Sequence, residues 1–219
     1  MKERFHNRTD AGRQLAQKLS QYARRPDVIV LALPRGGVPV AYEIATALQV
    51  PLDLCLVRKL GVPDRPELAM GAIASPNIRI LNQEIIASLD LSPQVVEQVT
   101  RHEQQELARR DRCYRGSRPF PPLRDRSVVV VDDGIATGST IRAAIAAIKY
   151  QSPARIMVAV PVAPSSTAAV LKPQVDNLVC LKLPDSLYSI SLWYEDFSQT
   201  SDQEVQQLLS QAMTSTLAS

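Results

Sequence analysis

SVVVVDDGIATGST, residues 127–140, contains the pattern that decides the fold. Four consecutive valines form an apolar run that lacks the alternation of a half-exposed strand, and the run ends in two adjacent acids. A strand that is apolar on both faces is typical of a parallel sheet covered by helices on each side. The residues that follow, GSTIRAAIAAIKY at 138–150, have the composition of a helix. The stretch therefore predicts a buried strand, a turn and a helix in an α/β protein.

The same alternation of strand and helix continues on both sides of this stretch. Further apolar runs predict strands, and the segments between them predict helices. The expected strands cover residues 28–33, 52–57, 154–162 and 176–184, and the expected helices cover residues 38–49 and 166–172. Upstream, Asp10 is expected to cap a helix that carries Leu15, Leu19 and Tyr22 on one face. The predicted fold class is a doubly wound α/β fold with a mostly parallel sheet and helices on both faces.

The middle of the chain interrupts this alternation. RKLGVPDRPELA, residues 58–69, is rich in turn formers and predicts a loop, followed by two short strands at 70–75 and 78–81. Residues 82–114 have a polar helical pattern. We expect an insert of about residues 76–126 within a single domain that spans residues 1–219. Its polar helix has two open interpretations: a solvated or dimer-forming face, and a mobile loop that closes over bound substrate, as the resemblance to an enzyme family given below implies.

Composition excludes several classes of protein. The chain has 219 residues, of which 45% are hydrophobic and 21% charged, values that fit a soluble globular domain. A formal net charge of +3 is too small to predict a nucleic-acid binder. Cys55, Cys113 and Cys180 lack the spacing of a disulfide framework or a zinc site. We expect a cytoplasmic protein with no membrane segment, in which these cysteines have no catalytic role.

The turn after the two acids has the chemistry of an anion site. Backbone N–H groups at the start of a helix lack partners, and the helix dipole adds partial positive charge, so a phosphate binds there favourably. Gly138 allows a close approach of the backbone, and Thr137, Ser139 and Thr140 add hydroxyl donors. The acids need a cation or donors beside them, which a hydrated Mg²⁺ or sugar hydroxyls would supply. The alternative is structural, in which the acids cap the helix and the glycine only turns the chain.

Two further segments are expected at the same edge of the sheet. LPRGGV, residues 33–38, follows the first core strand, and its glycines free backbone N–H groups to face an anion while Arg35 supplies a bidentate guanidinium. Arg58 and Lys59 are expected at the end of the second core strand, where they would add two positive charges to this edge of the sheet. An ordinary turn and a solvated strand terminus are the alternative interpretations.

These motifs together resemble a known enzyme family. VVVVDDGIATGST resembles the phosphoribosyl-pyrophosphate (PRPP) motif of the type I phosphoribosyltransferases, and LPRGGV is similar to their pyrophosphate loop. With RKLGVPDRPELAMGA, the chain is similar to a bacterial group of predicted phosphoribosyltransferases of unassigned substrate. The resemblance implies ribose contacts for Asp132 and Asp133, 5′-phosphate contacts for Ile135, Ala136, Thr137, Gly138, Ser139 and Thr140, pyrophosphate contacts for Arg35, Gly36 and Gly37, and a basic pair, Arg58 and Lys59, near the departing pyrophosphate.

The resemblance also implies an activity. It implies Mg²⁺-dependent transfer of the 5-phosphoribosyl group from PRPP to a nitrogenous acceptor with release of pyrophosphate, with Asp132, Asp133, Arg58 and Lys59 as the catalytic groups. Mg²⁺ is expected to be held by PRPP, with the two aspartates as candidate neighbours and no direct protein ligand assigned. The partners implied are PRPP, a small-molecule acceptor and a second copy of the chain, with no nucleic acid. The alternative is a non-catalytic PRPP or nucleotide-binding regulator, and retention of Arg35 with the basic pair favours catalysis.

The family's variable hood would recognise the acceptor. We expect this hood at about residues 183–219, with a contribution from the N-terminus. YSISLWYEDF, residues 188–197, is rich in aromatic residues, and Trp193 and Tyr194 are predicted to bind the acceptor by stacking on a planar base. The alternative is that these rings fill a small satellite core.

Three features depart from the family pattern. Gly134 stands where many relatives have a branched aliphatic residue, which predicts a looser turn. Ala136 stands where enzymes for hypoxanthine and guanine carry an acid, so a 6-oxopurine acceptor is disfavoured. No lysine occurs between Lys59 and Lys149, so the mobile-loop lysine expected of an orotate enzyme is missing and orotate is disfavoured as well.

Overall fold

The central element is a five-stranded sheet in which every pairing is parallel. The computed structural model describes residues 4–217. The sheet has the strand order β2-β1-β6-β7-β8. Its strands are β1 (Val28–Ala32), β2 (Leu52–Leu54), β6 (Ser127–Val131), β7 (Arg155–Val162) and β8 (Asn177–Lys182). These strands lie within the apolar runs of the sequence. The doubly wound α/β fold class is therefore confirmed.

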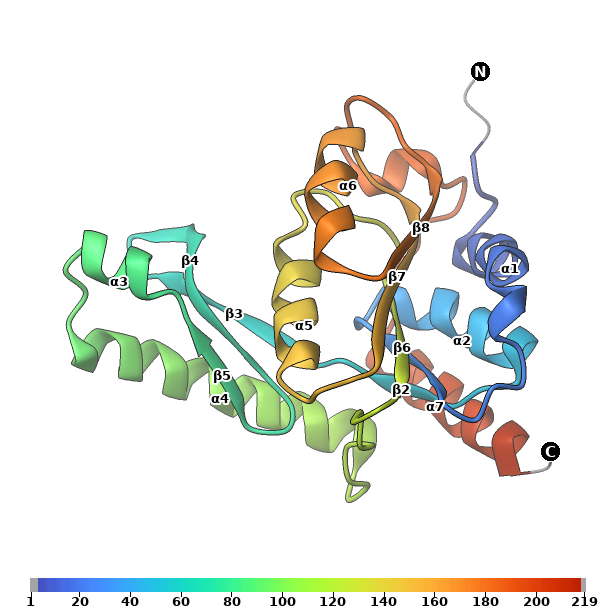
Figure 1. Ribbon diagram of the computed structural model, residues 1–219, viewed down its shortest axis with the longest axis horizontal. Coiled ribbons are helices and arrows are strands. Elements are labelled where there is room, and N and C mark those ends of the chain that lie inside the picture. Colours follow the sequence, from blue (N-terminus) through green and yellow to red (C-terminus); the bar gives the residue numbers. More distant parts are fainter. Residues whose placement is uncertain (1–3, 218–219) are drawn as a thin grey trace.

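Helices cover both faces of this sheet (Figure 1). The helices packed against it are α1 (Arg8–Lys18), α2 (Gly37–Leu48), α5 (Ser139–Lys149), α6 (Ser165–Leu171) and α7 (Asp202–Leu217). Successive residues of β1 point to opposite faces, so Val28 and Val30 belong to the core beneath α1, α2 and α7, whereas Ile29 and Leu31 belong to the core beneath α5 and α6. This two-sided burial explains why the strands carry no polar alternation.

The strand order locates the ligand-binding edge of the sheet. Counted along the sheet-forming strands alone, the order is 2-1-3-4-5, and the direction of winding reverses between β1 and β6. In open α/β sheets, ligands bind beyond the carboxyl ends of the strands at such a reversal. The loops that leave β1 and β6 are residues 33–36 and 132–138, which include two of the three motifs singled out in the sequence.

A lobe formed by residues 57–115 projects from this sheet (Figure 1). It contains a separate antiparallel sheet, β3 (Val57–Val62), β4 (Arg65–Ala74) and β5 (Ile78–Leu81), together with α3 (Gln83–Ser88) and α4 (Pro93–Arg115). The expected long polar helix is present with a break before Ser92, whose side chain accepts the N–H of Val95 and caps α4. The lobe packs its strands against α5 through Ala74, Ile78 and Ala147.

The predicted loop at residues 58–69 is wrong. These residues form β3 and the first half of β4, joined by a tight exposed turn. Register shifts on both sides of Gly61 accommodate the glycine within the strand, and Leu60 is buried in the core although the residues around it favour turns. As a result Arg58 and Lys59 lie at the start of β3, and not at the end of the second core strand as expected.

The N-terminal segment docks on residues 193–196 near the carboxyl edge of the large sheet. Phe5 donates its N–H to the carbonyl of Trp193 at 2.9 Å, and its own carbonyl accepts the N–H of Glu195 at 2.9 Å. The cap of α1 is Asn7, whose side chain accepts the N–H of Asp10, so the expected cap at Asp10 is corrected by one turn. Asn7 can accept because its backbone is extended, whereas Asp10 is already helical.

No helix within residues 4–217 is long and apolar enough to cross a membrane.

Candidate functional site

The loop after β1 and the acids after β6 lie in direct contact. Leu33 donates its N–H to the carbonyl of Val131 at 2.8 Å, and the chain then turns through a cis peptide between Pro34 and Arg35. A Cβ at Gly36 would lie 2.0 Å from Oδ2 of Asp133, and one at Gly37 would lie 2.7 Å from the carbonyl oxygen of Val131. Only glycine allows this approach, so the structure brings the two motifs together as predicted.

The two acids differ in their surroundings. Oδ1 of Asp132 accepts the backbone N–H of Asp133 at 2.8 Å, and burial together with the neighbouring negative charge raises the pKa of Asp132 well above its ordinary value. Asp133 is buried, and its Oδ2 accepts a hydrogen bond from Nε of Arg8 at 2.8 Å. Its carbonyl oxygen accepts one from the hydroxyl of Tyr194 at 2.6 Å.

Arg8 is a site residue that the sequence analysis missed. It is the first residue of α1, it lies 125 positions from Asp133 in sequence, and no local pattern marks it as different from the other arginines of the chain. Its guanidinium lies 3.9 Å from the ring centre of Phe197. Only the docking of the N-terminal segment on residues 193–196 places it beside the acids.

The phosphate loop, residues 135–140, has the geometry of a helix start. Gly138 is the N-cap of α5, and its backbone is in the left-handed region at φ 76°. Gly138 is buried, whereas Thr137 and Thr140 are exposed. The hydroxyls of Thr137 and Ser139 lie 3.1 Å apart. Ile135 differs, because its side chain is buried and its N–H donates to the carbonyl of Val162 at 2.8 Å. The N–H of Ile135 is therefore engaged within the fold.

A cleft of about 1110 Å³ separates this loop from the lobe. Its lining includes Thr137, Ser139 and Thr140 of the loop together with Arg58 and Lys59 of β3. Residues of α4, among them Gln98, His102, Glu103 and Arg110, complete it. The structure thus places the predicted basic pair and the predicted phosphate loop on one cleft.

The basic pair already has partners on the lobe. Nε of Arg58 lies 2.5 Å from Oε2 of Glu103, and both side chains are largely buried. Nζ of Lys59 donates to the carbonyl of Glu67 at 3.2 Å. Glu103 comes from α4, 45 positions later in sequence, and sequence reasoning did not find it.

The remaining predicted site residues do not line this cleft. The acids Asp132 and Asp133 and the loop of Arg35, Gly36 and Gly37 lie at the adjoining edge of the sheet. Nη1 of Arg35 lies 3.7 Å from Oδ1 of Asp202, at the start of α7.

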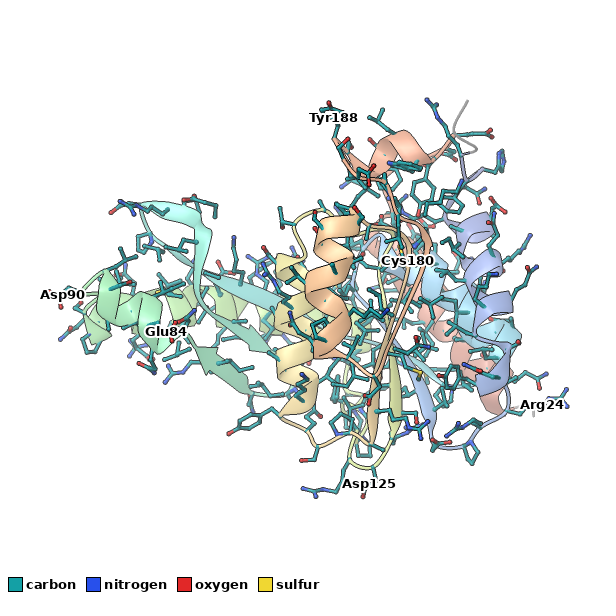
Figure 2. The ribbon with its side chains drawn as sticks, turned by 45° about the horizontal axis from the view of Figure 1, so that its top comes forward. Arg24, Glu84, Asp90, Asp125, Cys180 and Tyr188 are labelled. Atoms are coloured by element: carbon teal, nitrogen blue, oxygen red, sulfur yellow. The ribbon has the colours of Figure 1, made fainter. Side chains whose placement is uncertain are left out.

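The aromatic segment packs beneath the acids. Tyr194 is 3% exposed, with ring centres of Phe5 and Phe197 at 5.4 and 5.0 Å. Burial raises the pKa of its hydroxyl far above the ordinary value. An acceptor could stack on Tyr194 only if these rings separated, whereas Trp193 is half-buried at the edge of the same cluster. Tyr188, which is 93% exposed, lies at the outer end of this region (Figure 2).

Gly134 is closely packed, in contrast to the looser turn expected. A Cβ at this position would lie 2.7 Å from Cγ2 of Ile190. The space that a branched side chain would occupy is therefore filled from the segment that precedes Trp193.

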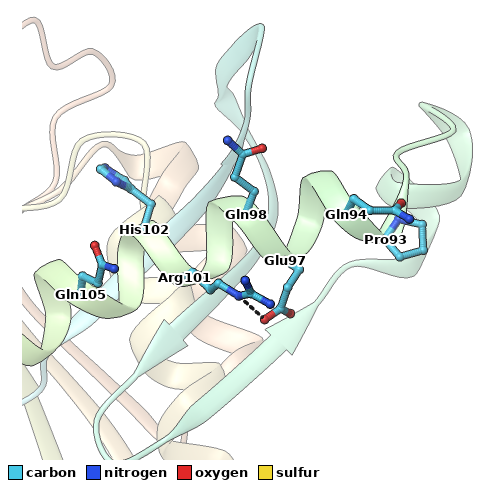
Figure 3. Close-up of a pocket in the computed structure, with 7 residues that line it drawn as sticks. All are labelled: Pro93, Gln94, Glu97, Gln98, Arg101, His102 and Gln105. Carbon is cyan, nitrogen blue, oxygen red and sulfur yellow. Dashed lines mark hydrogen bonds and ion pairs between the residues drawn. The ribbon is translucent and has the colours of Figure 1, made fainter.

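A second hollow, of about 730 Å³, follows the outer surface of α4 (Figure 3). All its lining residues, from Pro93 to Gln105, belong to that one helix. Arg101 donates to Glu97 at 3.2 Å, and Arg110 donates to Glu106 at 2.8 Å, so α4 carries two ion pairs at i, i+4 spacing.

Cys55, which is buried, and Cys180, which is half-buried, lack the properties of nucleophiles. Burial raises the pKa of Cys55 to about 12 and that of Cys180 to about 11, so both remain protonated near neutral pH. Among residues 4–217, no group of three or more His, Cys, Asp or Glu side chains could hold a metal ion.

The sequence of the chain is similar to those of known proteins. Residues 3–191 match the sequence profile of the phosphoribosyl transferase domain. "Putative phosphoribosyl transferase Rv0571c" of Mycobacterium tuberculosis (strain ATCC 25618 / H37Rv) is 44% identical over 208 residues, which cover 95% of this chain and 47% of that protein. The chain thus spans about half the length of the curated relatives it matches.

Solved structures show the same fold. TT1426 from Thermus thermophilus superposes with a TM-score of 0.83 at 35% identity, covering 94% of this chain and 97% of that one. AQ2163 from Aquifex aeolicus, at 10% identity and a TM-score of 0.50, covers 80% of this chain and 74% of that one, and shows a shared fold alone. The family profile covers most of the chain, and its match includes both sheet-edge loops and the basic pair. The chain therefore belongs to the phosphoribosyl transferase domain family.

Proposed function

We propose that the chain is a Mg²⁺-dependent phosphoribosyltransferase that moves the 5-phosphoribosyl group from PRPP to a nitrogenous acceptor and releases pyrophosphate. The observation that carries this proposal is the cleft that Arg58 and Lys59 line together with the phosphate loop. PRPP has a phosphate at one end and a pyrophosphate at the other. A cleft that combines a helix start with a separate pair of cations suits such a molecule better than a simple phosphate.

The reaction breaks the bond between C1 of ribose and a pyrophosphate oxygen and forms a bond between C1 and the acceptor nitrogen, which loses a proton. The protein's part is electrostatic. The start of α5 with Thr137, Ser139 and Thr140 would hold the 5′-phosphate. Arg58 and Lys59 would stabilise the negative charge that develops on the leaving pyrophosphate.

Asp132 and Asp133 would orient the ribose between these two ends. Their carboxylates would accept hydrogen bonds from the vicinal hydroxyls and favour positive charge as it develops on the sugar. Gly36 and Gly37 bring the backbone of the Arg35 loop against these acids, where it would meet the pyrophosphate. No nucleophilic side chain is required.

The acids also fit Mg²⁺, although they do not form a complete metal site. Arg8 pairs with Asp133, but burial and the neighbouring negative charge still raise the pKa of Asp132, so a further cation would favour the ionised form of both acids. Mg²⁺ keeps several waters and binds substrate phosphates with one or two protein carboxylates. Bound with PRPP near Asp132 and Asp133, it would neutralise charge on the pyrophosphate.

Two residues, Trp193 and Ala136, bear on the identity of the acceptor. Trp193 remains the ring that could stack on a planar acceptor, and Ala136 provides no acid to face a 6-oxopurine. We propose an acceptor other than a 6-oxopurine or orotate. A homodimer, a cytoplasmic location and the absence of a nucleic-acid partner belong to the same proposal.

The test is calorimetric titration of Mg²⁺ and PRPP into the wild-type chain and into Asp132→Asn with Asp133→Asn. The double variant should lose most of its PRPP affinity while remaining folded, although loss of the buried partner of Arg8 lowers its melting temperature. The matched control is Glu84→Gln with Asp90→Asn, which removes the same charge at the far end of the lobe (Figure 2). Unchanged affinity in the aspartate variant would overturn the site assignment.

A second measurement separates an enzyme from a regulator. Pyrophosphate release is followed with Mg²⁺ and PRPP across a panel of purines, pyrimidines and simple amines. Acceptor-dependent release establishes a transferase and names its acceptor class. Binding without release for any acceptor favours the non-catalytic regulator, and no binding at all rejects both.

A further inference from the structure

Arg8 contacts the acidic pair directly. Its Nε donates to Oδ2 of Asp133 at 2.8 Å, and its Nη1 donates to the carbonyl of Ser198 at 2.7 Å. The side chains of Arg8 and Asp133 are only 11% and 12% exposed. Removing either partner from a pair this well buried leaves an uncompensated charge, so the contact is not a surface ion pair of small consequence.

The same cluster holds Asp133 from two directions. Arg8 lies over the ring of Phe197, which packs on Tyr194. Tyr194 donates its hydroxyl to the backbone carbonyl of Asp133 at 2.6 Å. We name Arg8, Asp133, Tyr194 and Phe197 the Arg8 cluster. Both the carboxylate and the backbone of Asp133 are fixed by it.

The opposite side of the carboxylate is closed by the Arg35 loop. Gly36 approaches so closely that a Cβ would lie 2.0 Å from Oδ2 and 3.1 Å from Oδ1 of Asp133. The carboxylate is therefore confined between the backbone of Gly36 and the guanidinium of Arg8. Rotation away from this position would leave the buried Arg8 charge without its partner.

The position of Arg8 is itself determined by the N-terminal segment. Phe5 is completely buried and exchanges two backbone hydrogen bonds with Trp193 and Glu195. His6 donates its N–H to Asp10, and Asn7 caps α1, so that Arg8 is the first helical residue. Each of these contacts orients the start of α1 toward the acids.

We propose that Arg8 is a positioning residue of the ribose subsite, which fixes the carboxylate of Asp133 in the orientation that receives the sugar hydroxyls. This inference rests on the proposed function, since it assigns the ribose to Asp132 and Asp133. It adds the N-terminal helix to the site. It also predicts that the binding affinity for ligands containing ribose depends on Arg8, whereas the affinity for pyrophosphate alone does not.

The test compares three ligands on folded protein. Calorimetric titrations of Mg²⁺ with PRPP, of ribose 5-phosphate and of Mg²⁺ with pyrophosphate are made on the wild type and on Arg8→Met. The variant should lose about 10–100-fold in affinity for PRPP and for ribose 5-phosphate, the usual effect of removing a residue that orients a ligand-binding group. Its affinity for pyrophosphate should be unchanged.

Two further variants separate positioning from stability. Arg8→Lys keeps the charge but loses the planar fork, so it should recover part of the lost affinity. In an Asp133→Asn background, Arg8→Met should have no further effect on PRPP affinity, because the group it positions is already altered. The matched control is Arg13→Met on the same helix, where Nε lies 2.9 Å from Oε2 of Glu43 outside the site.

Each outcome decides the question. An Arg8→Met protein that binds PRPP as tightly as the wild type, or more tightly, overturns the positioning role and leaves the proposed function standing. An equal loss for all three ligands, or losses that add in the Asp133→Asn background, also overturns it. A wild-type chain that fails to bind PRPP rejects the proposed function, and the positioning role with it.

Discussion

At the scale of single residues, the site depends on the absence of side chains as much as on their presence. Gly36 has an ordinary helical φ of −60°, so backbone strain does not explain its identity. The explanation is steric, because Oδ2 of Asp133 occupies the place of a Cβ. A larger residue at position 36 would therefore have to displace the side chain of Asp133.

Gly36→Ala tests this contact. The added methyl group must displace the carboxylate of Asp133, so we expect PRPP affinity to fall by at least about tenfold, as when an orienting partner is lost. Titration calorimetry measures the affinity, and thermal melting measures stability. Gly116→Ala is the control for a loss of stability alone, since its φ of +63° strains an alanine while nothing lies within 4 Å of a Cβ there. Equal PRPP affinity in both variants would contradict the steric explanation.

At the scale of elements, α4 is tied to the large sheet by one buried cation. Arg115, the last residue of α4, is 3% exposed. Its Nε lies 2.9 Å from Oδ1 of Asp53, its Nη2 donates to the carbonyl of Leu54 at 2.5 Å, and it also pairs with Asp111. The end of the lobe is thereby joined to β2.

Arg115→Met should destabilise the protein by about 3–5 kcal/mol, because it leaves the carboxylate of Asp53 without its buried partner. The free energy of unfolding in urea measures this loss. Arg112→Met, one turn earlier at an exposed position, should change it by less than about 0.5 kcal/mol. A loss below about 1 kcal/mol at Arg115 would show that the ion pair contributes little.

The start of β1 makes the stability depend on pH. Arg25 and the hydroxyl of Ser127 hold the pKa of Asp27 at about 2. An unfolded chain has this pKa near about 3.9, so the ionised carboxylate stabilises the fold above about pH 4 and the contribution is lost as the pH falls toward 2.

Asp27→Asn checks the sign of this effect. The urea midpoint of the variant should be lower than that of the wild type at pH 7, and the difference should shrink between pH 4 and pH 3. A difference that stays constant from pH 7 to pH 3 would show that Asp27 acts through its shape alone.

At the scale of the whole molecule, the cleft is lined by residues of both the parallel sheet with its helices and the antiparallel lobe. The phosphate loop belongs to the parallel sheet and its helices, whereas Arg58 and Lys59 belong to the antiparallel lobe. A ligand with an anion at each end would contact both. PRPP should therefore slow amide hydrogen exchange in β3 and in the first turn of α5 together.

Ribose 5-phosphate, which lacks the pyrophosphate, should protect α5 alone. Hydrogen exchange followed by mass spectrometry distinguishes the two patterns. Protection of α5 but not β3 by PRPP would remove the lobe from the PRPP site.

The sequence predicts the sheet and the phosphate loop because their signals are local. Four valines, two acids and a glycine-containing turn are consecutive, and each has its own physical cause. The contacts of Arg8 and Glu103 had no such signal, since their partners lie 125 and 45 positions away. The hairpin of β3 and β4 was mistaken for a loop because its glycine and prolines are also turn formers. Tertiary packing of Leu60 against the core overrode that local preference.

The order of the strands also governs how the chain reaches this structure. β1 pairs with β6, and at their first pairing Asp27 accepts a hydrogen bond from Ser127, 100 residues away. Closing so long a segment has a high entropic cost before any contact offsets it, whereas the hairpins of the lobe form between neighbours in sequence. We expect the lobe to become ordered early and the β1–β6 pairing late. The acids and the Arg35 loop at the ends of those two strands would then be among the last parts of the molecule to form, so a newly made chain would acquire its candidate site only on completing its fold.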